Sequence, residues 1–441
     1  MIRLPDPVKK LINILEAAGY EAFAVGGCVR DSILGRKPND WDLCTNASPS
    51  QMQEVFAALR VIETGLQHGT LTVLMDGEAF EITTYRIDGD YSDGRHPDTV
   101  TFTADITEDL ARRDFTINAM AFNPSTGLID PFGGQHDLAE GLIRCVGDPV
   151  MRFTEDSLRI LRCVRFASQL DYMIEDSTVS AMHECLPLLN RVAAERIRVE
   201  FEKLLCGQAA VRILRDFRDI IASFIPEIIP MFDLDQKNDY HIYDVWEHSL
   251  QVISHIPADP VLRLIAFFHD ICKPETMTVT EEDWGHFYGH EQAGADITDS
   301  ILRRLKYDND TRETVVDVID KHKIVFQQTQ RHARRCLNKM GEERLRMLIE
   351  LELADVKSQN PKYTDERVEN ILAFRSILDE VLAAEQCFSI RHLAITGRDL
   401  LEAGIPQGPE IGRILKWLLE LVIEEKIENS KEALLEAVRN K

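Results

Sequence analysis

Apolar and polar residues alternate with a period of two along several short segments near the start of the chain, which predicts β-strands. Four such segments are separated by turn-forming residues: VIETG (61–65), GTLTVLM (69–75), AFEITTYR (79–86) and TVTFTA (99–104). Apolar residues at helical spacing lie among them, beginning with an amphipathic stretch over residues 1–20. After DPFGG (130–134) the pattern becomes almost wholly helical. The chain is therefore predicted to begin with an α/β head and to continue as an all-α remainder.

The 441 residues are enough for about two to four domains. No apolar run reaches the length of a membrane span, and the amphipathic N-terminal segment has no small-residue cleavage site, so neither a membrane anchor nor a signal peptide is predicted. The nine cysteines include no C-x-x-C pair, which predicts reduced thiols and no cysteine-bound zinc. These features together predict a cytoplasmic protein.

The net charge of −24 argues against a general nucleic-acid binder, which is normally basic. Arginines are nevertheless concentrated in one third of the chain, at 112, 113, 144, 152, 159, 162, 165, 191, 196 and 198, and a second basic cluster contains Arg331, His332, Arg334 and Arg335. Such clusters are usually solvated helix faces paired with acids. Their position beside the nucleotide motif described next favours a functional role here.

The segment FAVGGCVRDSILGRKPNDWDLCT (23–45) combines a glycine pair with two carboxylates, Asp40 and Asp42. A period of two predicts that both carboxylates lie on one face of a strand. Two carboxylates on one face repel each other unless a hard cation lies between them. Gly26 and Gly27 allow a backbone turn to approach a bulky anion such as a triphosphate. The combination predicts a site for a nucleoside triphosphate with magnesium, although each half alone is most often a plain turn.

This segment resembles the nucleotidyltransferase superfamily that includes DNA polymerase beta. The longer form GGCVRDSILGRKPNDWDLCT is similar to class II tRNA nucleotidyltransferases (CCA-adding enzymes) and to the related bacterial poly(A) polymerases. The resemblance implies a polymerase-beta-like mixed sheet with helices, two Mg²⁺ ions at Asp40 and Asp42, and a third carboxylate on a neighbouring strand. Glu81 is the best candidate for the third, and a surface strand glutamate is the alternative. Arg30 is counted among the nucleotide-binding residues.

The resemblance continues through DLARRDFTINAMA (109–121), where Arg112, Arg113 and Asp114 match a motif that contacts ribose and triphosphate in this family. Asp114 would accept a hydrogen bond from a ribose 2′-hydroxyl, supported by Asn118. The alternative is a helix start with Asp114 as its cap, and the two interpretations are compatible. The preceding segment YSDGRHPDTVTF (91–102) is similar to the flexible loop of enzymes that add all of CCA.

The segment FTEDSLRILRCVRFA (153–167) is expected to be helical, with Asp156 and Arg159 three residues apart on one face. An intrahelical ion pair worth a few tenths of a kcal/mol is one interpretation. The other is base recognition. Cytosine and adenine each present an exocyclic amine beside an unprotonated ring nitrogen, which Asp and Arg can match, whereas uracil and guanine cannot be matched. The segment contains the E-D-x-x-R motif of class II CCA-adding enzymes, with Glu155 preceding the pair. Arg162 and Arg165 are also expected to bind nucleotide.

Histidines and carboxylates recur in the second half of the chain at positions typical of a metal site on several helices. The pattern H…HD…D resembles the HD phosphohydrolase superfamily, and the ligands implied are His248, His269, Asp270 and Asp355, with His290 and His322 available for a second divalent metal. Such sites hydrolyse phosphoesters. Whether this site is active stays open at this stage.

We therefore expect a nucleotidyltransferase head (1–140), a helical neck (141–215), a helical body with the HD site (216–370) and a helical tail (371–441). The predicted activity is the addition of C, C and A to tRNA 3′ ends from CTP and ATP, and the tail is expected to contact tRNA. The alternatives are a poly(A) polymerase, a partial CC- or A-adding enzyme, a metal-dependent phosphohydrolase with an RNA-binding head, and a non-catalytic RNA-binding protein. No membrane partner is expected, and the oligomeric state stays open.

Overall fold

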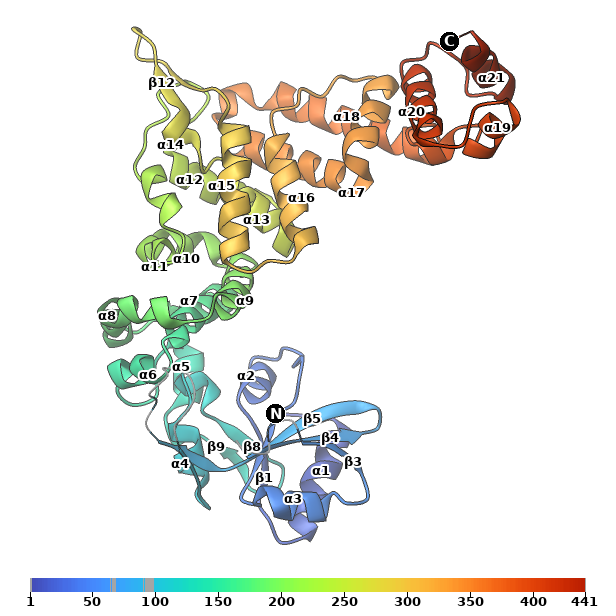
Figure 1. The fold of residues 1–441 in the computed structure, drawn as a ribbon. Coiled ribbons are helices and arrows are strands. Elements are labelled where there is room, and N and C mark those ends of the chain that lie inside the picture. Colours follow the sequence, from blue (N-terminus) through green and yellow to red (C-terminus); the bar gives the residue numbers. More distant parts are fainter. Residues whose placement is uncertain (1, 64, 66–68, 90, 92–98, 441) are drawn as a thin grey trace. The chain divides into compact units, whose positions relative to one another are not determined.

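The computed structural model describes residues 2–63, 65, 69–89, 91 and 99–440, and the chain folds into two compact units, Met1–Phe224 and Ile225–Lys441. The strands of the main sheet lie in the first unit, whereas the second unit is almost entirely helical (Figure 1). This arrangement confirms the predicted fold class of a mixed α/β head followed by helices.

The head contains a seven-stranded sheet in the order β3-β4-β5-β2-β1-β8-β9. Its strands are β1 (Ala22–Val25), β2 (Leu43–Thr45), β3 (Arg60–Ile62), β4 (Thr70–Met75), β5 (Glu78–Thr84), β8 (Ala121–Asn123) and β9 (Gly127–Ile129). The β2–β5 pair is parallel and the other pairs are antiparallel, so the sheet is mixed. Helix α1 (Asp6–Ala17) buries one apolar face, Val8, Leu11, Ile12 and Leu15.

Three of the four strands predicted from alternation belong to this sheet, and the fourth does not. β7 (Val100–Phe102) pairs with β6 (Arg86–Asp88) in a separate two-stranded ribbon. Of the segment 91–102 that was likened to a flexible loop, residues 92–98 lie outside the described residues.

Asp40 and Asp42 do not lie on a strand, which corrects the prediction made from their spacing. Both precede β2, which begins at Leu43. Only the carbonyl of Asp42 is still paired, accepting from the amide of Val25 at 3.0 Å. On the side of β1 the ladder ends here because β1 stops at Val25 and the chain turns at once into α2 (Gly27–Ile33), whereas β5 on the other side continues back to Glu78.

The remaining helices of the first unit lead from the head into the neck: α3 (Pro49–Val55), α4 (Ile106–Ala111), α5 (Gly134–Glu140), α6 (Pro149–Glu155), α7 (Leu158–Leu170), α8 (Asp176–Cys185), α9 (Ala194–Leu205), α10 (Ala210–Asp216) and α11 (Arg218–Ala222). A short parallel pair, β10 (Leu142–Ile143) and β11 (Met173–Ile174), lies among them. The expected single helix over 153–167 is broken, because Asp156 adopts an extended conformation between α6 and α7.

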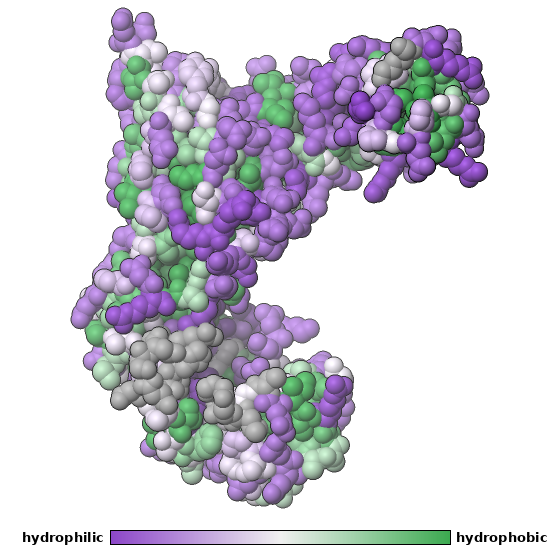
Figure 2. All heavy atoms as spheres, in the orientation of Figure 1, coloured by the Kyte–Doolittle hydropathy of each residue, from purple (hydrophilic) through white to green (hydrophobic). Residues whose placement is uncertain are grey.

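The second unit is built from α12 (Val245–His255), α13 (Pro260–Phe268), α14 (Lys273–Thr276), α15 (His290–Arg304), α16 (Asn309–Asp320), α17 (Gln330–Lys357), α18 (Asp365–Ala383), α19 (Gly397–Glu402), α20 (Pro409–Ile423) and α21 (Lys431–Arg439), with a hairpin of β12 (Met277–Val279) and β13 (Gly285–Phe287). α13 is buried along most of its length because nearly all of its residues are apolar. None of the helices in the described part of the chain combines the length and apolar character that a membrane span needs. Figure 2 shows hydrophilic side chains over most of the visible face of this unit.

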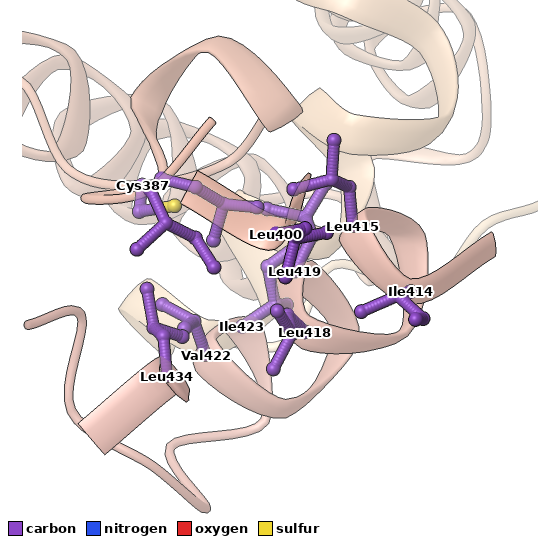
Figure 3. Packing of buried hydrophobic residues seen from close by; sticks show 11 residues of the cluster. Cys387, Leu400, Ile414, Leu415, Leu418, Leu419, Val422, Ile423 and Leu434 are labelled. Carbon is purple, nitrogen blue, oxygen red and sulfur yellow. The ribbon is translucent and has the colours of Figure 1, made fainter. Parts of the chain in front are cut away.

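The end of the chain has a hydrophobic core of its own. Figure 3 shows side chains of α19, α20 and α21 meeting in it, among them Leu400, Leu418 and Leu434, which are fully buried. The second basic cluster is attached here: Arg334 of α17 contacts Glu425 at 2.6 Å, and Arg335 contacts Glu424. These two arginines therefore follow the ordinary pattern of basic residues paired with acids.

Candidate functional site

The glycine pair forms the tight turn between β1 and α2. Gly26 has φ 81°, a left-handed conformation that favours glycine. A Cβ atom there would lie 3.0 Å from Nη1 of Arg113. Gly26 thus lets a guanidinium group come close to the backbone, beside the carboxylates that precede β2.

Asp40 and Asp42 directly precede β2, Glu81 lies within the neighbouring strand β5, and all three are exposed to solvent. Because β2 and β5 are parallel and Leu43 is paired with Ile82, Glu81 stands at the level of Asp42. Partial removal from water raises the pKa of Asp42 to about 6, and the charges of Asp40 and Glu81 add to the rise, against the opposing charge of Arg113. A raised pKa in a group of carboxylates is the expected result when their charges are not yet neutralised by a cation.

These three carboxylates suit magnesium in kind but do not form a closed cage. Within the described residues, the sets of three potential ligand atoms found within 4.8 Å of one another all lie in the second unit. Mg²⁺ is typically held by one or two carboxylates together with substrate phosphates and water, so an open group of carboxylates fits it. Asp40 and Asp42 are the residues that would hold the metal, and Glu81 is placed to assist.

The RRD motif is organised by a buried acid that the sequence analysis did not single out. Asp109 is fully buried and contacts the guanidinium of Arg112 at 2.9 Å and that of Arg113 at 3.5 Å. The spacing of three and four residues from Asp109 to these arginines is the signal that could have identified it.

Asp114 is almost completely buried and accepts four hydrogen bonds. One oxygen accepts from the amide of Phe115 at 2.8 Å and from Nδ2 of Asn118 at 3.1 Å. The other accepts from Nε and Nη2 of Arg162 at 2.8 and 2.6 Å. Burial alone would raise the pKa of Asp114, but Arg162, Arg159 and these hydrogen bonds outweigh it and hold the pKa well below its usual value.

The alternative interpretation of Asp114 as a helix cap is wrong, because the cap position lies one residue later. The turn that follows is a single 3₁₀ turn, Thr116–Asn118, whose cap position is Phe115. Phe115, Ile117 and Met120 are buried, as that interpretation expected. Asn118 in turn accepts from Nη1 of Arg30 at 2.8 Å, so Arg30, Asn118, Asp114 and Arg162 form one chain of hydrogen bonds.

Asp156 and Arg159 are not paired with each other, so the structure contradicts the interpretation as an intrahelical ion pair. Asp156 contacts Arg196 of α9 at 2.7 Å. Arg159 contacts Glu155 at 2.6 Å and donates to the carbonyl oxygens of Arg152 at 3.1 Å and Arg112 at 3.0 Å. Each member of the pair is therefore oriented by a different neighbour.

An aromatic ring beneath the arginines was also missed by the sequence analysis. The guanidinium carbons of Arg30, Arg162 and Arg165 lie 5.0, 5.5 and 3.7 Å from the centroid of Phe166. Arg165 also contacts Glu200, which is buried. The other two arginines contact acids as well, since Arg30 lies 2.8 Å from Asp31 and Arg162 lies 2.6 Å from Asp114. The only signal for Phe166 in the sequence is its helical spacing, which is equally typical of a core residue.

The four residues of the H…HD…D pattern and the two additional histidines come together in the second unit from five separate places. His248 lies on α12, His269 and Asp270 follow the last residue of α13, His290 begins α15, His322 follows α16, and Asp355 lies on α17. All are buried except Asp355, which is 18% exposed. Two sets of potential ligands, His248, His269 and Asp270, and Asp270, His290 and His322, overlap at Asp270.

The distances place Asp270 between the two sets. Its Oδ2 lies 3.1 Å from Nε2 of His269 and 3.5 Å from Nε2 of His248, and its Oδ1 lies 3.4 Å from Nε2 of His290. His248 also contacts Asp355 at 2.9 Å. A carboxylate with one oxygen toward each set is suited to bridge two divalent cations.

The tautomers of the second set support a cation. The Nδ1 atoms of His290 and His322 each face a backbone carbonyl at 2.6 Å, which can only accept, so each Nδ1 carries a proton. Their Nε2 atoms then face each other at 3.1 Å. Two facing lone pairs require a shared proton or a metal ion, and burial together with His269 and His290 lowers the pKa of His322 to about 3. The donor set of imidazoles and carboxylates fits divalent transition metals.

Models of known families match the chain in three segments: a poly A polymerase head domain at residues 22–144, an RNA and SrmB-binding site of polymerase A at 171–230, and a tRNA nucleotidyltransferase domain 2 at 276–438. Among curated proteins, the CCA-adding enzyme of Pediococcus pentosaceus is 32% identical over 98% of this chain and 97% of that protein. The CCA-adding enzyme of Levilactobacillus brevis is 35% identical over the same shares. This chain belongs to the bacterial class II CCA-adding enzyme family.

Solved structures agree with this family. The Bacillus stearothermophilus CCA-adding enzyme in complex with CTP matches with a TM-score of 0.69 and 27% identity, covering 99% of both chains. The Thermotoga maritima CCA-adding enzyme complexed with tRNA matches with a TM-score of 0.58 and 21% identity, over 98% of this chain and 94% of that one, which shows the shared fold. The polymerase-type head of this family implies a divalent metal, and the His/Asp cluster of the second unit can bind one as well.

The raised pKa of Asp42 predicts that metal affinity in the head depends on pH. A divalent ion must displace the proton of Asp42, so we expect binding to weaken by about tenfold per pH unit below about 6. In the metal-free protein the same shift costs stability as the pH rises from 3.8 towards 6. Calorimetric titration of Mn²⁺ into the parent and into Asp42→Asn isolates the head site from the second unit. A parent–variant difference that does not change across this pH range would contradict the prediction.

Proposed function

We propose that this protein adds C, C and A to the 3′ end of tRNA, using CTP and ATP. The observation that carries the proposal is the pair Asp156 and Arg159, whose members are unpaired with each other and are separately oriented by Arg196 and Glu155. If Asp156 and Arg159 formed an ion pair with each other, their hydrogen-bonding atoms would be less available to a base. Two separately held groups present an acceptor and a donor for the edge that cytosine and adenine share.

The head residues would supply the remaining parts of the reaction. Asp40 and Asp42, with Glu81 as the third carboxylate, would hold magnesium, and the metal would favour ionisation of the attacking 3′-hydroxyl and neutralise the triphosphate and the departing pyrophosphate. We assign nucleotide binding to Gly26, Gly27, Arg30, Arg112, Arg113, Arg162 and Arg165. We retain the division into head 1–140, neck 141–215, body 216–370 and tail 371–441, with the tail contacting tRNA.

We propose that Asp114 favours ribonucleotides by accepting a hydrogen bond from the ribose 2′-hydroxyl. The hydrogen bonds that it already accepts determine how this could happen. Its four acceptor positions are filled by protein donors, so a ribose 2′-hydroxyl must replace one of them. Arg162 is the exchangeable partner, since its side chain is 35% exposed whereas Asn118 is buried. Arg162 would then be released toward the phosphates of the same nucleotide.

The test of the activity is incorporation of labelled CTP and ATP, separately and together, into a tRNA that lacks its 3′ CCA. We expect two C residues from CTP alone, one further A when ATP is present, and no incorporation by Asp42→Asn, because the variant loses a metal-binding carboxylate. A long A-tract without use of CTP would indicate a poly(A) polymerase, and addition that stops after CC or adds only A would indicate a partial enzyme. Near-normal turnover by Asp42→Asn would contradict the assignment of the head.

Arg159→Ala should relax base selection while leaving metal binding intact. The variant lacks the donor that matches the ring nitrogen of cytosine and adenine, so discrimination against UTP and GTP should fall by about 1–3 kcal/mol. Single-nucleotide incorporation of all four triphosphates measures this. Arg191→Ala, at an exposed arginine of the same neck, is the matched control. Unchanged rejection of UTP by Arg159→Ala would show that base selection lies elsewhere.

A second activity is favoured by the two overlapping ligand sets of the second unit. We propose that His248, His269, Asp270 and Asp355, with His290 and His322, hold two divalent cations that support hydrolysis of phosphoesters. Metal ions at such a centre activate water and neutralise phosphate oxygens. His248 and His269 orient one side of Asp270, and His290 orients the other.

His269→Ala should separate the two activities. The variant removes one ligand of a buried centre, so we expect the divalent metal content of the second unit and Mn²⁺-dependent hydrolysis of p-nitrophenyl phosphate esters to be lost. Incorporation of CMP and AMP should stay at the parent level, because the residues assigned to that reaction lie in the first unit. Elemental analysis and the two assays check this. Hydrolysis that persists in His269→Ala would exclude this centre as its source.

A further inference from the structure

A pocket of about 570 Å³ opens beside the metal-binding cluster. Asp270, His322 and Asp355 line it, and so do Lys323 and Arg367. The pocket thus combines candidate metal ligands with cations that can bind an anionic substrate. The ligand set accounts for the phosphorus side of the bond to be broken. It assigns no group to the leaving oxygen on the other side of that bond.

Glu352 is an unassigned carboxyl group that lines this pocket. It lies on α17 one helical turn before Asp355, so both side chains are on the same face of the helix. Its Oε1 is shielded from solvent and has no hydrogen-bond partner among the described residues. A buried polar atom without a partner in a folded protein calls for an explanation such as a catalytic role.

Glu352 belongs to neither of the two three-residue ligand sets, and it lines the pocket that a substrate would enter. The nearby cations do not satisfy it either: Arg367 donates to Gln359, which donates in turn to Asp355 at 3.0 Å. Burial is the largest cause that raises the pKa of Glu352 well above its usual value, followed by the charge of Asp355, with a smaller rise from Asp270 and with Arg367 and Lys323 opposing. Burial of a carboxyl oxygen without a hydrogen-bond partner favours the neutral, protonated form of the group.

We propose that Glu352 donates a proton to the leaving-group oxygen when this centre hydrolyses a phosphoester. The inference rests on the proposed phosphohydrolase function. In the reaction, the oxygen of a water molecule forms a bond to phosphorus and the bond from phosphorus to the leaving oxygen breaks. The proton of Glu352 passes to that oxygen, so an alcohol departs, and the carboxylate regains a proton from solvent. The substrate class is therefore esters with a basic alkoxide leaving group, which need such a donor.

Glu352→Gln tests the proposal, because the amide keeps the size of the side chain but has no proton to transfer. With Mn²⁺ present, hydrolysis of ethyl phosphate and of the dinucleotide UpU should fall by about 10²-fold or more. Hydrolysis of p-nitrophenyl phosphate and bis(p-nitrophenyl) phosphate should change little, because p-nitrophenolate leaves without protonation. Glu350→Gln, two residues away on the same helix and paired with Arg375 at the surface, is the matched control.

Metal content and the Mn²⁺-induced rise in Tm provide readouts that do not depend on activity. Both should be equal in the parent and Glu352→Gln, whereas loss of metal would make Glu352 a ligand and overturn the proposal. An equal fall on both kinds of ester would overturn it as well, since it would indicate a structural role. If the parent itself hydrolyses none of the four esters, the phosphohydrolase function fails and this inference fails with it, whereas a failure confined to the leaving-group difference leaves that function standing.

Discussion

The carboxylate of Asp114 is buried, carries a negative charge and accepts four hydrogen bonds. The groups that donate these bonds are therefore restricted in position. Two of its donors, Phe115 and Asn118, belong to the head, and the third, Arg162, belongs to α7 of the neck. Removing a partner from a buried charge is costly, of the order of 3–5 kcal/mol. The head and neck are consequently joined where a nucleotide is expected, and the first unit behaves as one compact body up to Phe224.

The proposed base recognition would depend on how the nearby charges are paired. Three guanidinium groups lie around Phe166, and each contacts an acid: Arg30 contacts Asp31, Arg162 contacts Asp114, and Arg165 contacts Glu200. Asp156 and Arg159 are held by Arg196 and Glu155, so neither can neutralise the other. Side chains fixed in this way lose little entropy when a base arrives, which favours selective binding.

The sequence was sufficient for the class of fold, which depends on local patterns. Alternation identified β4 and β5, and the resemblance to the H…HD…D pattern named histidines and carboxylates that the fold gathers from separate helices. It failed where tertiary contacts decide. The spacing of Asp40 and Asp42 is that of a strand, but the turn at Gly26 ends the pairing with β1, and both aspartates precede β2. The spacing of Asp156 and Arg159 is that of a helical pair, but the chain is extended at Asp156 and its carboxylate turns to Arg196. Glu352 was missed because its isolation becomes visible only when the pocket is formed.

The two candidate metal sites show opposite physical designs. In the head the carboxylates are exposed. Partial removal from water, together with repulsion from the other carboxylates, raises the pKa of Asp42. The positive charge that would neutralise this group has to come from magnesium that arrives with the substrate. In the second unit the ligands are buried, and Asp270 keeps its charge because His269 and Lys273 outweigh the cost of its burial. Desolvating imidazoles and carboxylates without a cation leaves facing lone pairs such as those of His290 and His322. An open site suits a metal that is exchanged with each nucleotide, whereas a closed one suits resident metals that are kept through many turnovers. This difference explains how one chain can hold two metal-dependent centres whose ions need not compete.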